Sequence, residues 1–213
     1  MKTEALVAML ATGNGGGAPN PAPRRFAVAA GLGTLGAALL MVSLLGIRPD
    51  FASAVATPMF WVKLAFVGCV AGASLIAAAR LSRPGEPLGR MPGMLTIPVV
   101  AVWIAAATIL VDADPGQRKF MLLGETWSTC PWFIALLAIP AFVAMIWAMR
   151  GLAPTRLRVA GAAAGLVAGA IGALVYALHC TESTAPFLGT WYALGMLIPT
   201  AVGAVLGPRL LRW

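Results

Sequence analysis

Hydrophobic residues run in six long, uninterrupted stretches along this chain, separated by short polar segments. The stretches cover residues 26–46, 58–79, 93–111, 129–148, 158–178 and 187–207. At 1.5 Å of rise per residue, a helix of this length crosses the ~30 Å hydrocarbon core of a membrane. Continuous apolar runs indicate helices, because the strands of a membrane barrel alternate apolar and polar residues. The pattern therefore predicts an all-α integral membrane protein, a six-helix bundle.

The composition agrees with a protein that lies almost wholly in a membrane. Of the 213 residues, 60% are hydrophobic and only 10% are charged, and the mean hydropathy is +0.89. Soluble domains carry about 25% charged residues. No polar stretch between the apolar runs is long enough to form a soluble domain. We expect two regions: a cytoplasmic N-terminal segment with a Gly/Pro linker at 1–25, and a six-helix membrane domain at 26–213.

The basic residues are distributed unevenly between the two sides of the predicted bundle. If the N-terminus is cytoplasmic, three basic residues fall outside: Arg48, Arg118 and Lys119. Eleven fall inside: Lys2, Arg24, Arg25, Arg80, Arg83, Arg90, Arg150, Arg156, Arg158, Arg209 and Arg212. Lys63, the last of the fifteen, lies within the second span, where we expect it to snorkel to the interface. The positive-inside rule thus predicts that both termini are cytoplasmic. The net charge of +8 reports topology rather than nucleic-acid binding.

The first apolar run has one competing interpretation. Arg24-Arg25-Phe26 before it resembles a twin-arginine signal, and Ala52-Ser53-Ala54 resembles a cleavage site. The run is longer than a usual signal core and is followed by further spans, which favours a transmembrane helix.

The N-terminal segment has the pattern of a short amphipathic helix. Residues 3–11 can be capped by Thr3, and Leu6, Met9 and Leu10 form an apolar stripe. Such a short helix needs a surface on which to fold. It lies either on the membrane or in the groove of a cytoplasmic partner. The candidate partner-binding residues are Thr3, Glu4, Leu6, Met9, Leu10, Arg24 and Arg25.

Small residues at four-residue spacing predict close helix packing. The pattern is Gly161/Gly165/Gly169 in the fifth span, with Gly68/Gly72 and Gly203/Gly207 in the second and sixth. Pro98, Pro140 and Pro199 lie inside the third, fourth and sixth spans and are expected to bend them.

Two cysteines carry most of the chemistry that this sequence offers. Cys130 opens the fourth span and Cys180 closes the fifth, and the short loop between these spans makes them antiparallel neighbours. Both cysteines then lie at the outer side, close enough for a disulfide to be permitted. Because a helix N-terminus stabilises a thiolate, we expect Cys130 to be the more nucleophilic. A static structural disulfide is the alternative. Cys69, in the middle of the second span, is expected to be a packing residue.

The surroundings of Cys180 suggest soft-metal binding as a second chemistry. His179 and Glu182 flank it, and with two thiolates they would complete a ligand set for a thiophilic ion, although a lone histidine is more often an interfacial residue. His179, Glu182 and Trp127 are the expected auxiliary residues. No CxxC, GxSxG, HExxH or phosphate loop occurs. We therefore expect a non-enzyme. A membrane thiol or quinone oxidoreductase and a small metal-transporter subunit remain as alternatives.

Two groups of short motifs run through the chain. The first group is Met1-Lys2-Thr3-Glu4-x-Leu6, Gly124-x-Thr126-Trp127-x-x-Cys130-Pro131 and Ala153-Pro154. The second is Tyr176-Ala177-Leu178-His179-Cys180-x-Glu182, Phe187-x-x-x-Trp191-Tyr192 and Gly207-Pro208-Arg209-x-Leu211-x-Trp213. Taken together, these motifs resemble those of the NrsF-type negative regulators, which are six-helix membrane anti-sigma factors. The Gly-rich stretch Gly13–Gly17 departs from the pattern and suggests a shorter docking segment.

This resemblance implies a regulatory function. A protein of this kind holds an extracytoplasmic-function (ECF) sigma factor at the bacterial inner membrane, as a multi-pass protein with no direct nucleic-acid contact. Cys130 and Cys180 would face the periplasm and respond to heavy-metal or oxidative stress, which releases the sigma factor. No resident cofactor is implied, only transient heavy-metal binding at the cysteines. The sequence does not determine the oligomeric state, the trigger chemistry or which sigma factor is bound.

Overall fold

The computed structural model describes Glu4 and residues 21–86, 89–152 and 154–212, all of them helical or in connections between helices. The long helices are α2 (Pro21–Leu44), α4 (Pro58–Leu81), α5 (Met91–Asp112), α7 (Cys130–Met149), α8 (Leu157–Tyr176) and α10 (Ala193–Leu210). Short elements join them: α3 (Phe51–Val55), α6 (Pro115–Leu123), α9 (Ala185–Phe187) and the π-helical turn η1 (Leu188–Tyr192). Six segments are long and apolar enough to cross a membrane, which confirms the predicted fold class.

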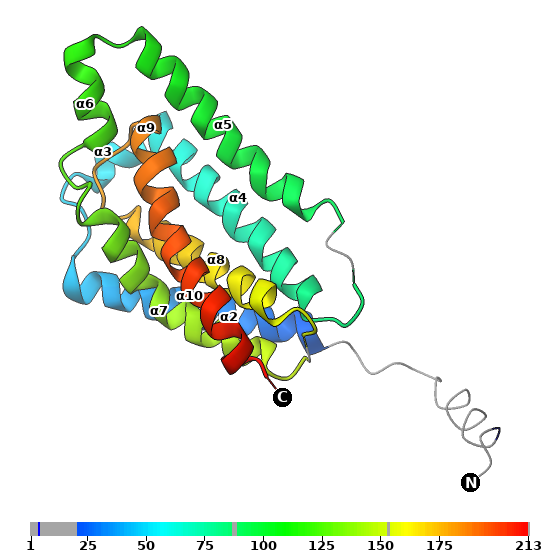
Figure 1. Ribbon diagram of the computed structural model, residues 1–213. Helices are drawn as coiled ribbons and strands as arrows, with labels where there is room; N and C mark the ends of the chain where they lie inside the picture. The colour runs from blue at the N-terminus through cyan, green and yellow to red at the C-terminus, as the bar shows by residue number, and fades with distance from the viewer. Residues whose placement is uncertain (1–3, 5–20, 87–88, 153, 213) are drawn as a thin grey trace.

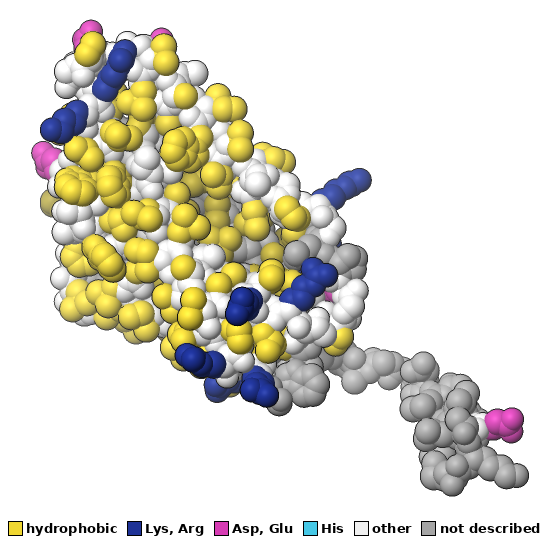
Figure 2. Space-filling model, viewed as in Figure 1, with side chains coloured by type: hydrophobic (Ala, Val, Ile, Leu, Met, Phe, Trp, Pro, Cys, Tyr) yellow, Lys and Arg dark blue, Asp and Glu magenta, His cyan; other side chains and the backbone are white. Residues whose placement is uncertain are grey.

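The long helices alternate in direction, so that their ends gather in two groups (Figure 1). At one end lie the start of α2, the end of α10 and the connections α4–α5 and α7–α8; we call it the basic end. At the other end lie α3, α6, α9 and the loops around Cys130 and Cys180; we call it the thiol end. Lys and Arg side chains collect at the basic end, and hydrophobic side chains cover the flank between the two ends (Figure 2). This distribution suits a bundle that crosses a bilayer.

Helix α8 forms the centre of the bundle and packs against α10, α7, α4 and α2. Its glycines allow this close packing. A Cβ atom at Gly161 would overlap the carbonyl oxygen of Gly203, and one at Gly165 would overlap that of Pro199. The predicted small-residue packing is therefore confirmed for α8 and α10, where two helix backbones touch.

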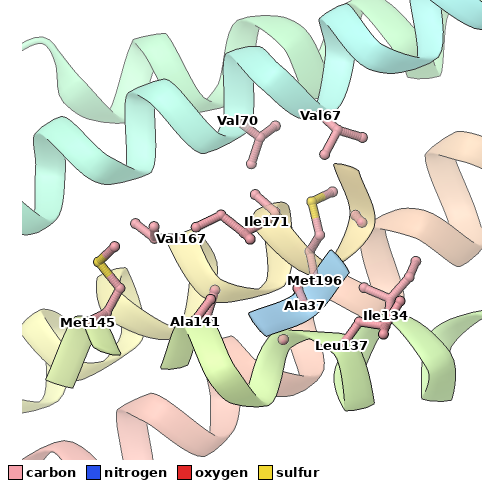
Figure 3. Close-up of a cluster of buried hydrophobic side chains, with 14 of the residues drawn as sticks. Ala37, Val67, Val70, Ile134, Leu137, Ala141, Met145, Val167, Ile171 and Met196 are labelled. Carbon is pink, nitrogen blue, oxygen red and sulfur yellow. The ribbon is translucent and has the colours of Figure 1, made fainter. Parts of the chain in front are cut away.

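Within the chain, the matching prediction for α4 is wrong. A Cβ atom at Gly68 or Gly72 would meet nothing within 4 Å, because these glycines lie on the side of α4 that faces away from α8. Cys69 lies between them in sequence and is exposed, so it is not a packing residue either. The buried face of α4 is formed instead by larger side chains. Val67 and Val70 point toward Val167 and Ile171 of α8 (Figure 3).

The intrahelical prolines lie where the sequence placed them, with Pro98 in α5, Pro140 in α7 and Pro199 in α10. In α7 this proline has a packing partner, because Gly36 of α2 leaves room for Pro140. Helix α5 is the outermost of the six and packs mainly against α4 and α9. It belongs to the periphery, whereas α4, α7, α8 and η1 together shape the thiol end.

Candidate functional site

Cys130 is placed by the first turn of α7. Pro131 occupies the first helical turn, which suits proline because that position needs no backbone donor. The backbone N–H of Cys130 donates to the carbonyl of Thr126 at 2.9 Å, which fixes the residue at the entry of the helix. Its side chain is fully buried in the bundle.

Cys180 follows the last turn of α8, and its backbone N–H donates to the carbonyl of Tyr176 at 2.9 Å. It is 2% exposed. The Cys130 and Cys180 thiols are joined by a hydrogen bond, and both are free. The predicted meeting of the two cysteines at one end of the bundle is therefore confirmed. We call this pair the dithiol centre.

A buried lysine completes the dithiol centre. Lys63 of α4 is 0% exposed, so the expectation that it snorkels to the surface is wrong. Its ammonium group donates to the carbonyl of Cys180 at 3.0 Å and to that of Glu182 at 2.8 Å. It also lies 4.9 Å from the centroid of the Tyr192 ring, within cation–π range. Sequence reasoning missed this residue.

A signal for the burial of Lys63 was present in the sequence. Phe66, Val67 and Val70 follow it at i+3, i+4 and i+7, and all three are buried. Residues at this spacing share one helix face. A lysine in the middle of an apolar face points into the bundle, and here it reaches the segment that follows α8. The carbonyls of Cys180 and Glu182 lie beyond the end of α8 at Tyr176, and both accept hydrogen bonds from the ammonium.

A second cation reaches the same end of α8. The Arg48 guanidinium donates to the Asp50 carboxylate at 2.7 and 2.6 Å and to the carbonyl of Cys180 at 3.4 Å. The hydrogen bond from Arg48 lowers the pKa of Asp50, and the same contact raises the pKa of Arg48. Arg48 thus has a carboxylate partner. Among the residues that the structure describes, no carboxylate forms an ion pair with Lys63.

Tyr192 covers the centre from the side of α10. It is fully buried, and its hydroxyl faces Cys180 without a hydrogen bond of regular geometry. Its position comes from η1, a π-helical turn of the kind that is frequent at functional sites. Tyr176 of α8 lies against it, with the ring centroids 6.0 Å apart. The dithiol centre is therefore enclosed by aromatic rings and shielded from water.

The electrostatics distinguish the two thiols. The pKa of Cys180 is lowered to about 5, first by the hydrogen bond that Cys130 donates and then by the Lys63 ammonium, which together outweigh burial. A thiol with this pKa is a thiolate at neutral pH. The arrangement favours Cys180 as the anionic partner, against the expectation that the helix N-terminus makes Cys130 the stronger nucleophile. The difference arises because Lys63, which the sequence predicts at the membrane interface, instead contacts the Cys180 segment.

The predicted auxiliary residues have other partners. The Nδ1 atom of His179 lies 3.0 Å from the carbonyl oxygen of Gly46, and the Glu182 carboxylate accepts from the backbone N–H of Glu125 at 2.8 Å. Trp127 packs on Trp191, with 5.3 Å between ring centroids. Across the described ranges, no three His, Cys, Asp or Glu side chains gather to hold a metal ion. The larger ligand set expected from His179 and Glu182 is therefore not assembled, which leaves the two sulfurs.

Of the candidate partner-binding residues, three can be placed. Glu4 and Arg24 are exposed. Arg25 lies over the Trp147 ring at 5.4 Å and donates to the Trp147 carbonyl at 3.3 Å, so it fastens α2 to the end of α7. The remaining four, which are Thr3, Leu6, Met9 and Leu10, lie outside the described residues.

Fold and site together define a class: a six-helix membrane protein with a dithiol centre at one end and most of its described basic residues at the other. The model of the NrsF family, described as negative regulator of sigma F, matches residues 10–213. The chain belongs to this family.

Two curated relatives align with the chain from end to end. The "Probable anti-sigma-F factor NrsF" of Azospira oryzae (strain ATCC BAA-33 / DSM 13638 / PS) is 52% identical over 213 residues, covering 100% of both chains. The "Anti-sigma-F factor NrsF" of Caulobacter vibrioides (strain NA1000 / CB15N) is 39% identical over 215 residues, again covering 100% of both. No solved structure matches the chain.

Proposed function

We propose that this protein is a membrane-bound anti-sigma factor that holds an ECF sigma factor at the bacterial inner membrane and releases it when Cys130 and Cys180 react. The names of both relatives support the anti-sigma role. The observation that carries the sensing role is the hydrogen bond between two buried thiols at the end of the bundle remote from the start of α2. The basic end faces the cytoplasm in this proposal, since it holds most of the basic residues.

Oxidation is the first chemistry open to the dithiol centre. The Cys180 thiolate attacks one oxygen of a peroxide, which forms a sulfenic acid and releases hydroxide or alkoxide. The Cys130 thiol then displaces water from the sulfenic acid, and a disulfide forms. Two electrons pass from the two sulfurs to the peroxide, so atoms and charge balance. The second chemistry is capture of a thiophilic cation by both sulfurs, which gives up the remaining thiol proton.

Either reaction must change the affinity for the sigma factor by acting across the bilayer. A tenfold change in affinity needs a differential binding free energy of only ~1.4 kcal/mol between the two states. The partner surface in this proposal comprises the exposed Arg24, the N-terminal segment and the loops of the basic end. We expect no turnover with quinones or dithiols, because the protein acts as a regulator.

The experiment measures the thiol state of the cysteines and the release of the sigma factor in the same cells. Cells carry Cys130→Ser, Cys180→Ser or the control Cys69→Ser, with a reporter transcribed by the partner sigma factor. The thiol state is trapped by alkylation before and after peroxide or Cd²⁺ exposure. We expect both centre variants to lose the induced response and Cys69→Ser to keep it, because Cys69 is exposed on α4 whereas the two thiols of the centre are buried. An induced response that survives both centre substitutions would refute the sensing role.

A further inference from the structure

Lys63 is an energetically expensive residue at its position. An ammonium group that is fully buried in a membrane bundle loses its hydration, and such groups usually mark functional sites. A methionine would fill the same apolar face of α4 without that penalty. The charge is instead balanced by the Cys180 and Glu182 carbonyls, the Tyr192 ring and the neighbouring thiolate. Every one of these groups belongs to Cys180, to the segment that follows it, or to Tyr192, which covers the dithiol centre.

The contacts of Lys63 also link three helices. It projects from α4, it holds the segment that follows α8, and that segment is joined through the thiols to the first residue of α7. A disulfide would bring the two sulfurs to ~2 Å, well inside their present hydrogen-bond contact. Cys180 then moves toward α7, and its carbonyl oxygen is the group that accepts a hydrogen bond from Lys63. The movement of Cys180 therefore either shifts α4 or breaks this hydrogen bond.

Helix α4 is suited to carry such a displacement. It runs from the dithiol centre to the basic end, where Arg80 and Arg83 lie close to Glu86. Its contact with α8 is made by side chains, whereas α10 is held to α8 backbone against backbone. At the basic end a groove of about 380 Å³ opens between α4 and α2, lined by Phe26, Ile76 and Arg83 among others. This end of α4 therefore has room to move.

We propose that Lys63 is the positioning residue that couples the dithiol centre to α4, so that reaction of the thiols shifts the basic end of α4 and with it the surface offered to the partner. The proposal rests on the sensing role of Cys130 and Cys180 given above. It assigns transmission to one helix and one side chain. Lys63 takes no part in bond formation; it converts a change at Cys180 into a change in helix position.

The experiment separates thiol chemistry from its readout. Lys63→Met removes the charge and the hydrogen-bond donors at similar length, and Lys63→Gln keeps an amide donor with shorter reach. Lys119→Met is the matched control, because Lys119 is exposed on α6. In each strain, disulfide formation after peroxide is measured by alkylation trapping, and sigma-dependent transcription is measured in the same culture. Membrane abundance of the protein is quantified alongside.

Loss of the ammonium raises the pKa of Cys180 and can slow thiolate attack, so the comparison uses the final extent of oxidation at saturating peroxide. We expect the Lys63 variants to reach the same final extent of disulfide as the unaltered protein to within about twofold. The ratio of reporter activity after and before peroxide should fall at least about fivefold, the lower end of typical allosteric coupling. Lys119→Met should change neither. A variant at normal abundance that oxidises and still releases the sigma factor normally would overturn the proposal, as would an equal loss of oxidation and response, which indicates a purely structural role. If Lys63→Met fails to accumulate, Lys63→Gln decides by the same two readouts.

The sensing role of the two cysteines and the coupling role of Lys63 can be refuted independently. If Cys130→Ser and Cys180→Ser abolish the response while Lys63→Met preserves it, Lys63 is not the coupling residue and the sensing role stands. If the response survives both serine substitutions, the sensing role fails whatever Lys63 does.

Discussion

The two opposite faces of α8 are built in different ways. Toward α10, glycines let the helix backbones touch, with Gly161 against Gly203 and Gly165 against Pro199. Toward α4, valines and an isoleucine fill the interface, and Lys63 is buried at its thiol end. Backbone contact leaves one arrangement of two helices, whereas a side-chain interface tolerates small shifts. The glycine face therefore fixes α10 against α8. The α4 face can shift, and it also contains the buried charge of Lys63.

Substitution on the glycine face should give the largest effect on stability. In Gly165→Ala the new Cβ meets the backbone of Pro199 and Thr200, which cannot move aside without separating α8 from α10. We expect destabilisation of about 1–3 kcal/mol, the usual range for overpacking. Gly72→Ala is the control. Its Cβ meets open space and alanine favours helix by up to ~1 kcal/mol, so the variant should be neutral or stabilised.

Thermal unfolding in detergent, followed by tryptophan fluorescence, compares the two glycine variants. Equal stability of Gly165→Ala and Gly72→Ala would contradict the distinction between the two faces.

The charged end of the α4 face makes a pH-dependent prediction. Because the pKa of Cys180 is about 5, the thiolate should be present at neutral pH and disappear as the pH falls through about 5. The pKa of Cys180 in the folded protein lies below that of a free thiol, ~8.5. The stability that the thiolate gives to the folded protein is therefore fully present above pH ~8.5 and is lost as the pH falls through the folded pKa. Ultraviolet thiolate absorbance during an acid titration measures the midpoint. Lys63→Met should raise it, since the ammonium lowers the pKa.

Two controls assign the thiolate signal. Cys180→Ser should abolish the acid-range transition, and Cys69→Ser should leave it unchanged. A transition that persists without Cys180 would assign the thiolate to another residue.

The apolar part of the α4 face should show the smallest of these effects. Val67→Ala removes two methyl groups from a fully buried side chain and leaves a small void between α4 and α8, which we expect to cost about 0.5–1 kcal/mol. Val62→Ala on the exposed side of α4 should stay within ~0.5 kcal/mol of the parent. The same unfolding assay applies. A loss at Val67 as large as that at Gly165 would mean that both faces of α8 are equally rigid.

The sequence predicted the parts of this structure that depend on long, simple patterns. The six spans follow from run length, and the meeting of Cys130 with Cys180 follows from the short loop between their helices. The errors at Gly68, Cys69 and Lys63 share a cause. Membrane helices are apolar on all sides, so composition does not reveal which face is buried. Depth along the span places Cys69 and Lys63, and four-residue spacing pairs Gly68 with Gly72, but neither signal identifies the face that meets α8. Only the spacing of Lys63 to Val67 and Val70 carried that information.

The roles of His179 and Glu182 could not be predicted for a different reason. Both are adjacent to Cys180 in sequence, yet the chain turns sharply after α8 and points the three side chains in different directions. His179 reaches the segment after α2, and Glu182 reaches the segment before α7. Neighbours in a turn are poor guides to a shared site, because the backbone path decides where each side chain points.

The π-helical turn at Leu188–Tyr192 has a consequence for the last membrane helix as a whole. A π turn contains one residue more than an α turn, so it rotates the side chains before it by ~100° relative to those after it. Because the turn ends at Tyr192, the residues that it offsets are those of α9 before it, whereas Tyr192, Gly203 and Gly207 share one face of the helix that follows. Deleting a single residue from the turn would restore the regular winding and rotate α9, with the segment that carries Cys180 in front of it, relative to the face of α10 that meets α8.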